Sequence, residues 1–276
     1  GDSIATKLLA KHPELASTHV SEIGAIVSAA CLAHDLGNPP FGHSGEKAIA
    51  TYFSEGKGMV LKSQLSSMEW EDFTHFEGNA NAFRLLTHQF QGRRKGGFVM
   101  TYSTLASIVK YPFPSILAGK KPKFGFFTTE IDDYIKIAEE LGIKRLSQEG
   151  EPIKYARHPL VFLVEAADDI CYQMMDIEDA YKLKLLTPRE TKELYQLFLD
   201  EKKKERVDEV FSLVTDENEQ IAYLRATVIG ILVKECTRVF MKNEESILEG
   251  KFEGALIKHI SEPLNLAYQQ CTKVAV

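Results

Sequence analysis

Residues 20–46 read VSEIGAIVSAACLAHDLGNPPFGHSGE, and this stretch indicates the fold class. Apolar residues in its first half recur at spacings of three and four, which predicts a helix over 20–33. The character then changes, because His34 and Asp35 are followed by a glycine and two prolines. Such residues end helices and make rigid turns. We therefore expect Gly37 to stop the helix and His34 and Asp35 to project from its end.

A histidine and an aspartate at a rigid helix end are typical of a metal site, because imidazole and carboxylate bind divalent transition ions. Adjacent residues on a helix point about 100° apart, so one cation needs further ligands from elsewhere in the chain. Ordinary surface polarity is the alternative for such a pair. The Gly-Asn-Pro-Pro-Phe-Gly-His continuation at 37–43 favours the metal site.

The rest of the chain is also dominated by helical patterns. The apolar repeat predicts further helices over 158–175 and 221–240. Thr187-Pro188-Arg189-Glu190 predicts a capped helix start, and we expect an exposed helix from there to about residue 203. We find no period-two alternation between hairpin turns and no internal repeat of about 20–50 residues. The expected fold is all-α.

The composition is that of a globular protein, with 276 residues, 44% hydrophobic and 26% charged. We expect one functional region over 1–276, within a length that allows one or two domains. Four scattered cysteines without C-x-x-C pairing and the lack of a long apolar run or leader predict a cytoplasmic protein and no membrane partner. The 33 basic and 39 acidic residues give a net charge of −6, which argues against general coating of nucleic acid.

Three polar residues lie at helical spacing in and just after the predicted helix 158–175. Asp168, Tyr172 and Asp176 recur every four residues, so they drift by only about 40° per step and share one face. Carboxylates in an apolar helix indicate a bound cation, a hydrogen-bonding ligand or an exposed face. The sequence leaves these three explanations open.

Residues 91–127 form a stretch rich in glycine and proline that contains no aspartate or glutamate. Its basic residues are Arg93, Arg94, Lys95, Lys110, Lys120, Lys121 and Lys123. In an acidic protein, this composition predicts a long loop with short helical pieces that binds an anion. A solvated lysine-rich loop is one alternative. A groove for single-stranded nucleic acid, with Tyr102, Tyr111 and Phe113 as stacking residues, is another.

Several motifs occur in the order found in one known family. They are HDLGNPPFGHSGE at 34–46, HFEGNA at 75–80, KYP at 110–112, KFGFF at 123–127, and EAADDI-x-Y at 165–172. This set resembles the HD-domain deoxynucleoside triphosphate triphosphohydrolases, specifically the bacterial dGTPases. The resemblance is specific from residue 33 to about 180 and weaker near 261–263 and 273–276. It implies an all-α HD-domain helical bundle with additional helices.

The resemblance also implies roles for individual residues. One divalent cation, either Mn, Mg, Fe, Ni or Co, is expected among His34, Asp35 and Asp168. Acid–base chemistry and phosphate positioning are expected from His43, Glu46 and His75. Contacts to the triphosphate are expected from Asn79, Lys110, Tyr111 and Lys123, and contacts to the deoxyribose from Tyr172 and Asp176.

The implied function is metal-dependent hydrolysis of dNTPs, with dGTP expected first, to deoxynucleoside and tripolyphosphate. Two alternatives stay open, namely another HD-type nucleotide or phosphate-ester phosphohydrolase and a non-catalytic HD nucleotide-binding module. The family also implies a homo-oligomer, often with a regulatory nucleotide.

One motif of the family is missing. The first metal ligand in the family is a histidine within an Arg-Leu-Thr-His-Ser-type helix, and this sequence starts after the place of that motif. His12 and His19 lie upstream of His34 but lack the motif around them. We therefore expect an internal fragment of a longer protein, without the first metal ligand and without the base contacts of the missing ends.

Overall fold

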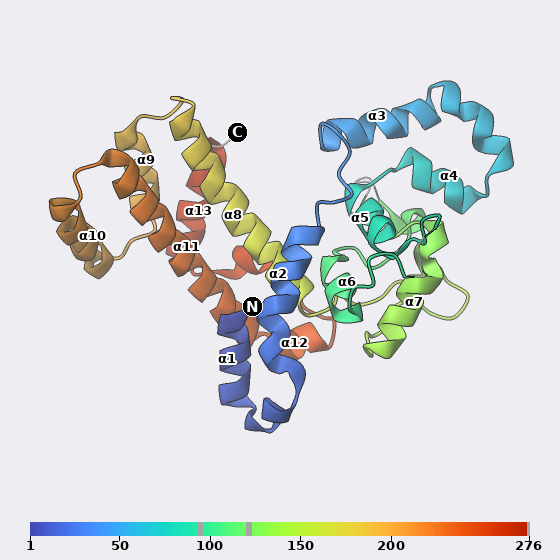
Figure 1. The fold of residues 1–276 in the computed structure, drawn as a ribbon, viewed down its shortest axis with the longest axis horizontal. Helices are drawn as coiled ribbons and strands as arrows, with labels where there is room; N and C mark the ends of the chain where they lie inside the picture. The colour runs from blue at the N-terminus through green and yellow to red at the C-terminus, as the bar shows by residue number, and fades with distance from the viewer. Residues whose placement is uncertain (93–95, 120–122, 275–276) are drawn as a thin grey trace. The chain divides into compact units, whose positions relative to one another are not determined.

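The structure, a computed structural model, describes residues 1–92, 96–119 and 123–274. Within these residues the chain is helical, and the extended pairing is limited to two isolated bridges, Pro114 with Phe126 and Arg145 with Tyr155 (Figure 1). The all-α prediction is confirmed. The predicted basic residues Arg93, Arg94, Lys95, Lys120 and Lys121 lie outside the described residues.

The chain forms two compact units, one of residues 1–164 and 245–252 and the other of residues 165–244 and 253–276. The helices of the first unit are α1 (Asp2–Lys11), α2 (Ile23–Ala33), α3 (His43–Ser54), α4 (Ser67–Thr74), α5 (Gly78–Thr87), α6 (Tyr102–Ile108) and α7 (Ile131–Glu140). Its 3₁₀ segments are Pro13–Ser17, His19–Glu22, Lys57–Gln64, Ser115–Leu117 and Thr128–Glu130.

Two helices cross the boundary between the units along the chain, α8 (Val161–Lys182) and α12 (Glu244–Leu248). The second unit continues with α9 (Pro188–Gln196), α10 (Glu201–Leu213), α11 (Glu217–Lys242), the 3₁₀ segment Leu256–His259 and α13 (Glu262–Val274). The predicted helices over 20–33, 158–175 and 221–240 are thus present, with ends shifted by up to seven residues.

The core of the first unit contains part of the predicted loop 91–127. α6, from the middle of that loop, packs against α2. Phe126 is fully buried, and its ring stacks on Tyr134 of α7 with centroids 4.6 Å apart, while Phe83 of α5 meets the same tyrosine edge-on. The described part of the loop is therefore also a core element, and it places Lys110 and Lys123 on a packed scaffold.

The second unit corrects one prediction. The capping box of Thr187 and Glu190 forms as expected, but the helix ends at Gln196 instead of near residue 203. It is not simply exposed either, because Tyr195 is fully buried and donates its hydroxyl hydrogen to the Met174 carbonyl at 3.0 Å. The chain turns after Gln196 because Phe198 is buried, and Asp200 then caps the separate helix α10.

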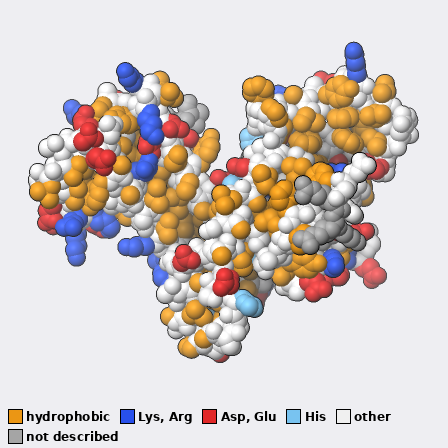
Figure 2. All heavy atoms as spheres, in the orientation of Figure 1, with side chains coloured by type: hydrophobic (Ala, Val, Ile, Leu, Met, Phe, Trp, Pro, Cys, Tyr) orange, Lys and Arg blue, Asp and Glu red, His pale blue; other side chains and the backbone are white. Residues whose placement is uncertain are grey.

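Exposed apolar side chains gather over α3, the 3₁₀ segment Lys57–Gln64 and α4, which lie side by side in the first unit (Figure 2). They are Tyr52, Met59, Val60, Leu61 and Phe73. A contiguous exposed apolar surface is typical of a protein contact. Among the residues that the structure describes, no helix is both long enough and apolar enough to cross a bilayer.

Candidate active site

The His34–Asp35 pair lies directly after α2, which ends at Ala33. The imidazole of His34 points its Nδ1 at the Cys31 carbonyl at 2.8 Å, and its Nε2 lies 3.4 Å from Asp35 Oδ2. In a ligating histidine, one ring N–H usually donates to a carbonyl and the other ring nitrogen binds the metal ion, and the Nδ1 contact of His34 matches this arrangement. Asp35 Oδ1 in turn accepts a hydrogen bond from Asn38 Nδ2 at 2.9 Å.

Gly37 is required for a close approach. A Cβ on Gly37 would lie 2.1 Å from both the Ala82 nitrogen and the Gly78 oxygen, which belong to the first turns of α5. Its own carbonyl accepts from Asn81 Nδ2 at 2.9 Å. The expected role as a helix stop is therefore wrong, because α2 has already ended; Gly37 instead lets the turn after Asp35 lie against α5.

The two donors fit part of a divalent cation site. Imidazole and carboxylate side by side, each oriented by a second hydrogen bond, are a common partial ligand set. Across residues 1–92, 96–119 and 123–274, no three His, Cys, Asp or Glu side chains gather as a metal site. The third expected ligand, Asp168, belongs to the second unit. The three-ligand set stays a prediction.

His43 and Glu46 form a dyad at the start of α3. His43 Nδ1 lies 2.7 Å from Glu46 Oε2, and Glu46 Oε1 accepts from the Gly78 backbone N–H at 2.7 Å. The imidazole is 84% exposed, whereas the carboxylate is 12% exposed. A half-buried, anchored carboxylate thus fixes the tautomer of an accessible imidazole, which leaves His43 Nε2 available to take or give a proton.

His75 has a carboxylate partner of its own. It follows the last residue of α4, and its Nδ1 lies 2.8 Å from Glu71 Oε2. Both side chains are about one-third exposed. The two predicted catalytic histidines are therefore oriented by different glutamates, His43 by Glu46 and His75 by Glu71.

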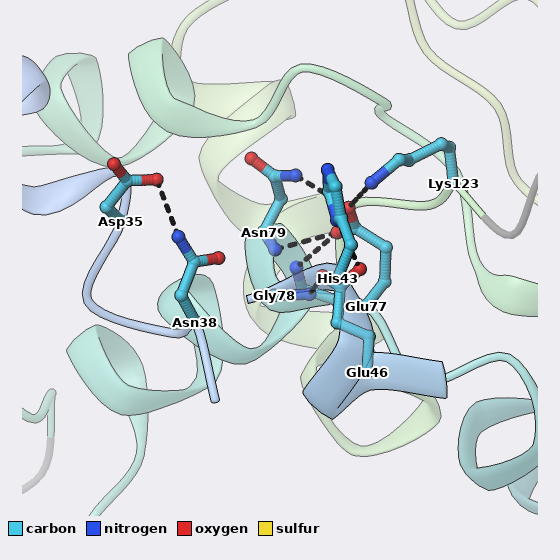
Figure 3. Close-up of polar contacts among 9 residues, drawn as sticks. Asp35, Asn38, His43, Glu46, Glu77, Gly78, Asn79 and Lys123 are labelled. Carbon is cyan, nitrogen blue, oxygen red and sulfur yellow. Dashed lines mark hydrogen bonds and ion pairs between the residues drawn. The ribbon is translucent and has the colours of Figure 1, made fainter. Parts of the chain in front are cut away.

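Glu77 gathers two of the predicted substrate residues (Figure 3). This residue caps α5 and is fully buried. Its Oε1 accepts from Lys123 Nζ and from Asn79 Nδ2, each at 2.7 Å. Burial alone would lower the pKa of Lys123, but the hydrogen bond and charge of Glu77, together with the charge of Glu46, raise it above the ordinary value. Lys123 is therefore a fixed cation at any physiological pH.

The backbone brings the Lys110–Tyr111 and Lys123 segments together. A Cβ on Gly125 would lie 2.2 Å from the backbone carbonyl oxygen of Tyr111, and the Gly125 N–H donates to the Phe113 carbonyl at 3.1 Å. Lys110 and Tyr111 are half-buried. The described part of the basic loop thus places three of the four predicted triphosphate residues on adjoining segments, because Gly125 permits the close packing.

The predicted polar stripe lies on one continuous helix, α8, along the part of it that belongs to the second unit. Asp168 and Tyr172 are exposed, Asp176 is half-buried, and buried Ile170, Met174 and Ile177 form the opposite side. Desolvation, with a contribution from the charge of Asp179, raises the pKa of Asp176. The stripe exists as a surface feature of the second unit, and the sugar contacts remain predictions.

The sequence analysis assigned no role to three residues of this region: Glu71, and Asn38 and Glu77, which lie within the quoted motifs. A glutamate directly before a glycine that starts a helix is a capping signal, so the capping role of Glu77 could have been predicted from the sequence. Its partner Lys123 could not, since the two are 46 positions apart. Asn38 lies inside the turn that the sequence had already indicated.

Curated relatives carry the names that the motifs suggested, although no family model matches the chain. A deoxyguanosinetriphosphate triphosphohydrolase-like protein of Pseudomonas aeruginosa is 40% identical over 265 residues, which is 92% of this chain and 57% of that protein. A deoxyguanosinetriphosphate triphosphohydrolase-like protein of Synechocystis is 37% identical over 269 residues, which is 94% of this chain and 59% of that protein. The deoxyguanosinetriphosphate triphosphohydrolase of Yersinia enterocolitica is 30% identical over 290 residues, 91% and 55% of the two chains.

The chain spans somewhat more than half the length of these curated relatives. Along that span it belongs to the family of the deoxyguanosinetriphosphate triphosphohydrolases and their like proteins, and the resemblance given by the motifs is confirmed.

Proposed function

We propose that the protein hydrolyses deoxynucleoside triphosphates, with dGTP as the preferred substrate, to deoxynucleoside and tripolyphosphate. The observation that carries the proposal is the His43–Glu46 dyad. The dyad, the turn after His34–Asp35 and Lys123 each form a hydrogen bond with the start of α5 or its capping residue Glu77. The names of the homologous proteins support the same reaction.

In this proposal His34 and Asp35 hold a divalent cation, with Asp168 as the further ligand expected from the resemblance. Such an ion, when bound, supplies Lewis-acid polarisation of a phosphate oxygen and activation of water. Asn38 keeps the Asp35 carboxylate in one orientation through its 2.9 Å hydrogen bond. Metal identity is left to experiment, since imidazole and carboxylate suit several first-row ions.

Proton transfer falls to His43 in this proposal. Because Glu46 holds the Nδ1 side, the exposed Nε2 can deliver a proton to the departing 5′-oxygen of the deoxynucleoside. His75, with Glu71, is a second imidazole for holding a proton or a phosphate oxygen. Lys123 has two N–H donors left beyond its bond to Glu77, which suit the oxygens of a triphosphate.

The test uses the full-length protein with Mn²⁺, each of the four dNTPs and GTP, with products resolved by phosphorus NMR. The expected result is deoxyguanosine plus tripolyphosphate from dGTP. Turnover should be lost in His34→Ala and Asp168→Ala and kept in His19→Ala, an exposed histidine outside the motif. Pyrophosphate plus dGMP would instead indicate another HD-type phosphohydrolase, and lack of turnover with any nucleotide would indicate a binding module.

We also propose that the protein is a cytoplasmic homo-oligomer. The exposed apolar side chains over α3, the segment Lys57–Gln64 and α4 support an interface there. Light scattering on Val60→Asp, a position 73% exposed, should show a smaller assembly than the unsubstituted chain. An unchanged mass in that variant would remove this surface from the interface.

A further inference from the structure

The first turn of α5 offers no open backbone donors to an anion. Helix N-termini commonly bind phosphates through their free N–H groups. Here Gly78 N donates to Glu46 Oε1 at 2.7 Å, and Asn79 N and Ala80 N donate to Glu77 Oε2 at 2.7 and 3.2 Å. Contacts to a phosphate in this region must therefore come from side chains.

Glu77 is an unexpected residue for such a place. Its side chain is fully buried, and four N–H donors surround its carboxylate, from the backbone of Asn79 and Ala80 and from the side chains of Asn79 and Lys123. A buried negative charge beside groups assigned to a polyanionic substrate opposes binding through its own field. We therefore expect Glu77 to have a role that offsets this unfavourable effect on substrate binding.

We propose that Glu77 is a positioning residue that aims the ammonium of Lys123 and the amide of Asn79 at the phosphate chain of the nucleotide. This inference rests on the proposed function. One of the three ammonium donors of Lys123 is used by Glu77 and two remain, so the carboxylate fixes the direction in which those two point. A lysine fixed before binding loses less side-chain entropy when a phosphate arrives.

Glu77→Gln separates this role from helix capping. The amide oxygen of glutamine still accepts from the N–H groups of Asn79 and Ala80, whereas its NH₂ group faces two other donors, Lys123 Nζ and Asn79 Nδ2. The variant therefore keeps the helix cap but loses the contacts that orient Lys123 and the Asn79 amide. We expect the KM for dGTP to rise about tenfold to a hundredfold, as for loss of a charge-assisted hydrogen bond, while kcat changes by less than about threefold.

The matched control is Glu69→Gln. Glu69 also contributes to a helix start, since its Oε2 accepts from the Ser66 backbone N–H at 2.8 Å in the capping box of α4. It contacts none of the predicted site residues in the described structure. We expect its KM and kcat to stay within about twofold of the unsubstituted enzyme.

A double-substitution cycle with Lys123→Met tests whether Glu77 acts through the lysine. The double variant should lose at most about twofold beyond Lys123→Met alone, because contacting partners are not independent. Losses that multiply would overturn the role of Glu77 in aiming Lys123, and a fall in kcat at unchanged KM would overturn the whole proposal. If Glu77→Gln does not fold, Glu77→Asp replaces it, because aspartate caps helices well but its shorter side chain withdraws the carboxylate from Lys123.

Binding of inorganic tripolyphosphate, measured by calorimetry on the full-length protein, separates this proposal from the proposed function. Absence of tripolyphosphate among the products of every nucleotide would refute the reaction alone. In that case weaker tripolyphosphate binding by Glu77→Gln than by Glu69→Gln still supports positioning. Equal binding by the two variants overturns it, whether or not the enzyme turns over.

Discussion

His158 predicts how the stability of the protein depends on pH. The imidazole is half-buried in the first unit, its Nδ1 accepts from the Leu160 backbone N–H at 3.3 Å, and Ser107 Oγ lies 3.4 Å from the same atom. Desolvation lowers the pKa of His158 from 6.5 to about 4. The folded protein therefore keeps this imidazole neutral over a pH range in which the unfolded chain protonates it.

The sign follows from proton binding. Between pH 6.5 and about 4 the unfolded state binds more protons than the folded state, so the free energy of unfolding falls as the pH falls. At about 1.4 kcal/mol per pKa unit, the whole effect is about 3.5 kcal/mol. Integrated between pH 7.5 and 5.0, it removes about 2 kcal/mol.

The assay is urea unfolding of the chain at both pH values, compared with His158→Asn. Asparagine keeps an oxygen acceptor for the Leu160 N–H but does not titrate. The variant should lose about 2 kcal/mol less than the unsubstituted chain between pH 7.5 and 5.0. His19→Asn, at an exposed position, should behave like the unsubstituted chain. Equal losses in His158→Asn and the unsubstituted chain would refute the reasoning.

Three further predictions concern buried hydroxyls, a close backbone approach and the metal. Tyr134→Phe should raise the free energy of unfolding by about 1 kcal/mol, because its buried hydroxyl has no partner among the described residues, whereas Tyr195→Phe should lower it by about 1 kcal/mol. Denaturant midpoints that move in the same direction would contradict this pair. Gly37→Ala should destabilise by about 2–3 kcal/mol because its Cβ would meet backbone at 2.1 Å, while Gly230→Ala, in α11 with open space around it, should stabilise by about 0.5–1 kcal/mol. Chelation of divalent ions should abolish dNTP turnover and added Mn²⁺ should restore it; turnover that survives chelation would argue against the His34–Asp35 cation.

Local sequence signals were sufficient for the fold class and for several helix ends. The apolar repeat located α2, α8 and α11, and the Thr187–Glu190 capping box formed as predicted, because both depend on residues within a few positions of one another. The end of α9 was predicted about seven residues too late. The lysine-rich stretch after Gln196 continues to favour helix locally, but burial of Phe198 and Leu199 in the second unit decides the break.

The candidate site could be predicted as a set of motifs but not as a set of contacts. Each motif identified chemically suitable residues, yet Glu77 and Lys123 are paired over 46 positions and Glu46 and Gly78 over 32. Spacing along the chain carries no information about such pairs, because folding of the intervening segments sets them. The assignment of Glu46 to His43 and of Glu71 to His75 likewise became visible only in three dimensions.

The contacts explain why motifs so far apart occur together. In the turn after Asp35, the Gly37 carbonyl accepts a hydrogen bond from Asn81. The Glu46 carboxylate of α3 accepts from the Gly78 N–H, and the Lys123 ammonium donates to Glu77. All three partners lie within five consecutive residues at the start of α5. Gly78 must lack a side chain there, since a Cβ would lie 2.4 Å from Asn38 Oδ1 and 3.0 Å from Glu46 Oε1. One helical turn therefore fixes His34 and Asp35, the His43–Glu46 dyad and Lys123 relative to one another, so a change in that turn acts on all the proposed roles at once: cation binding, proton transfer and phosphate binding.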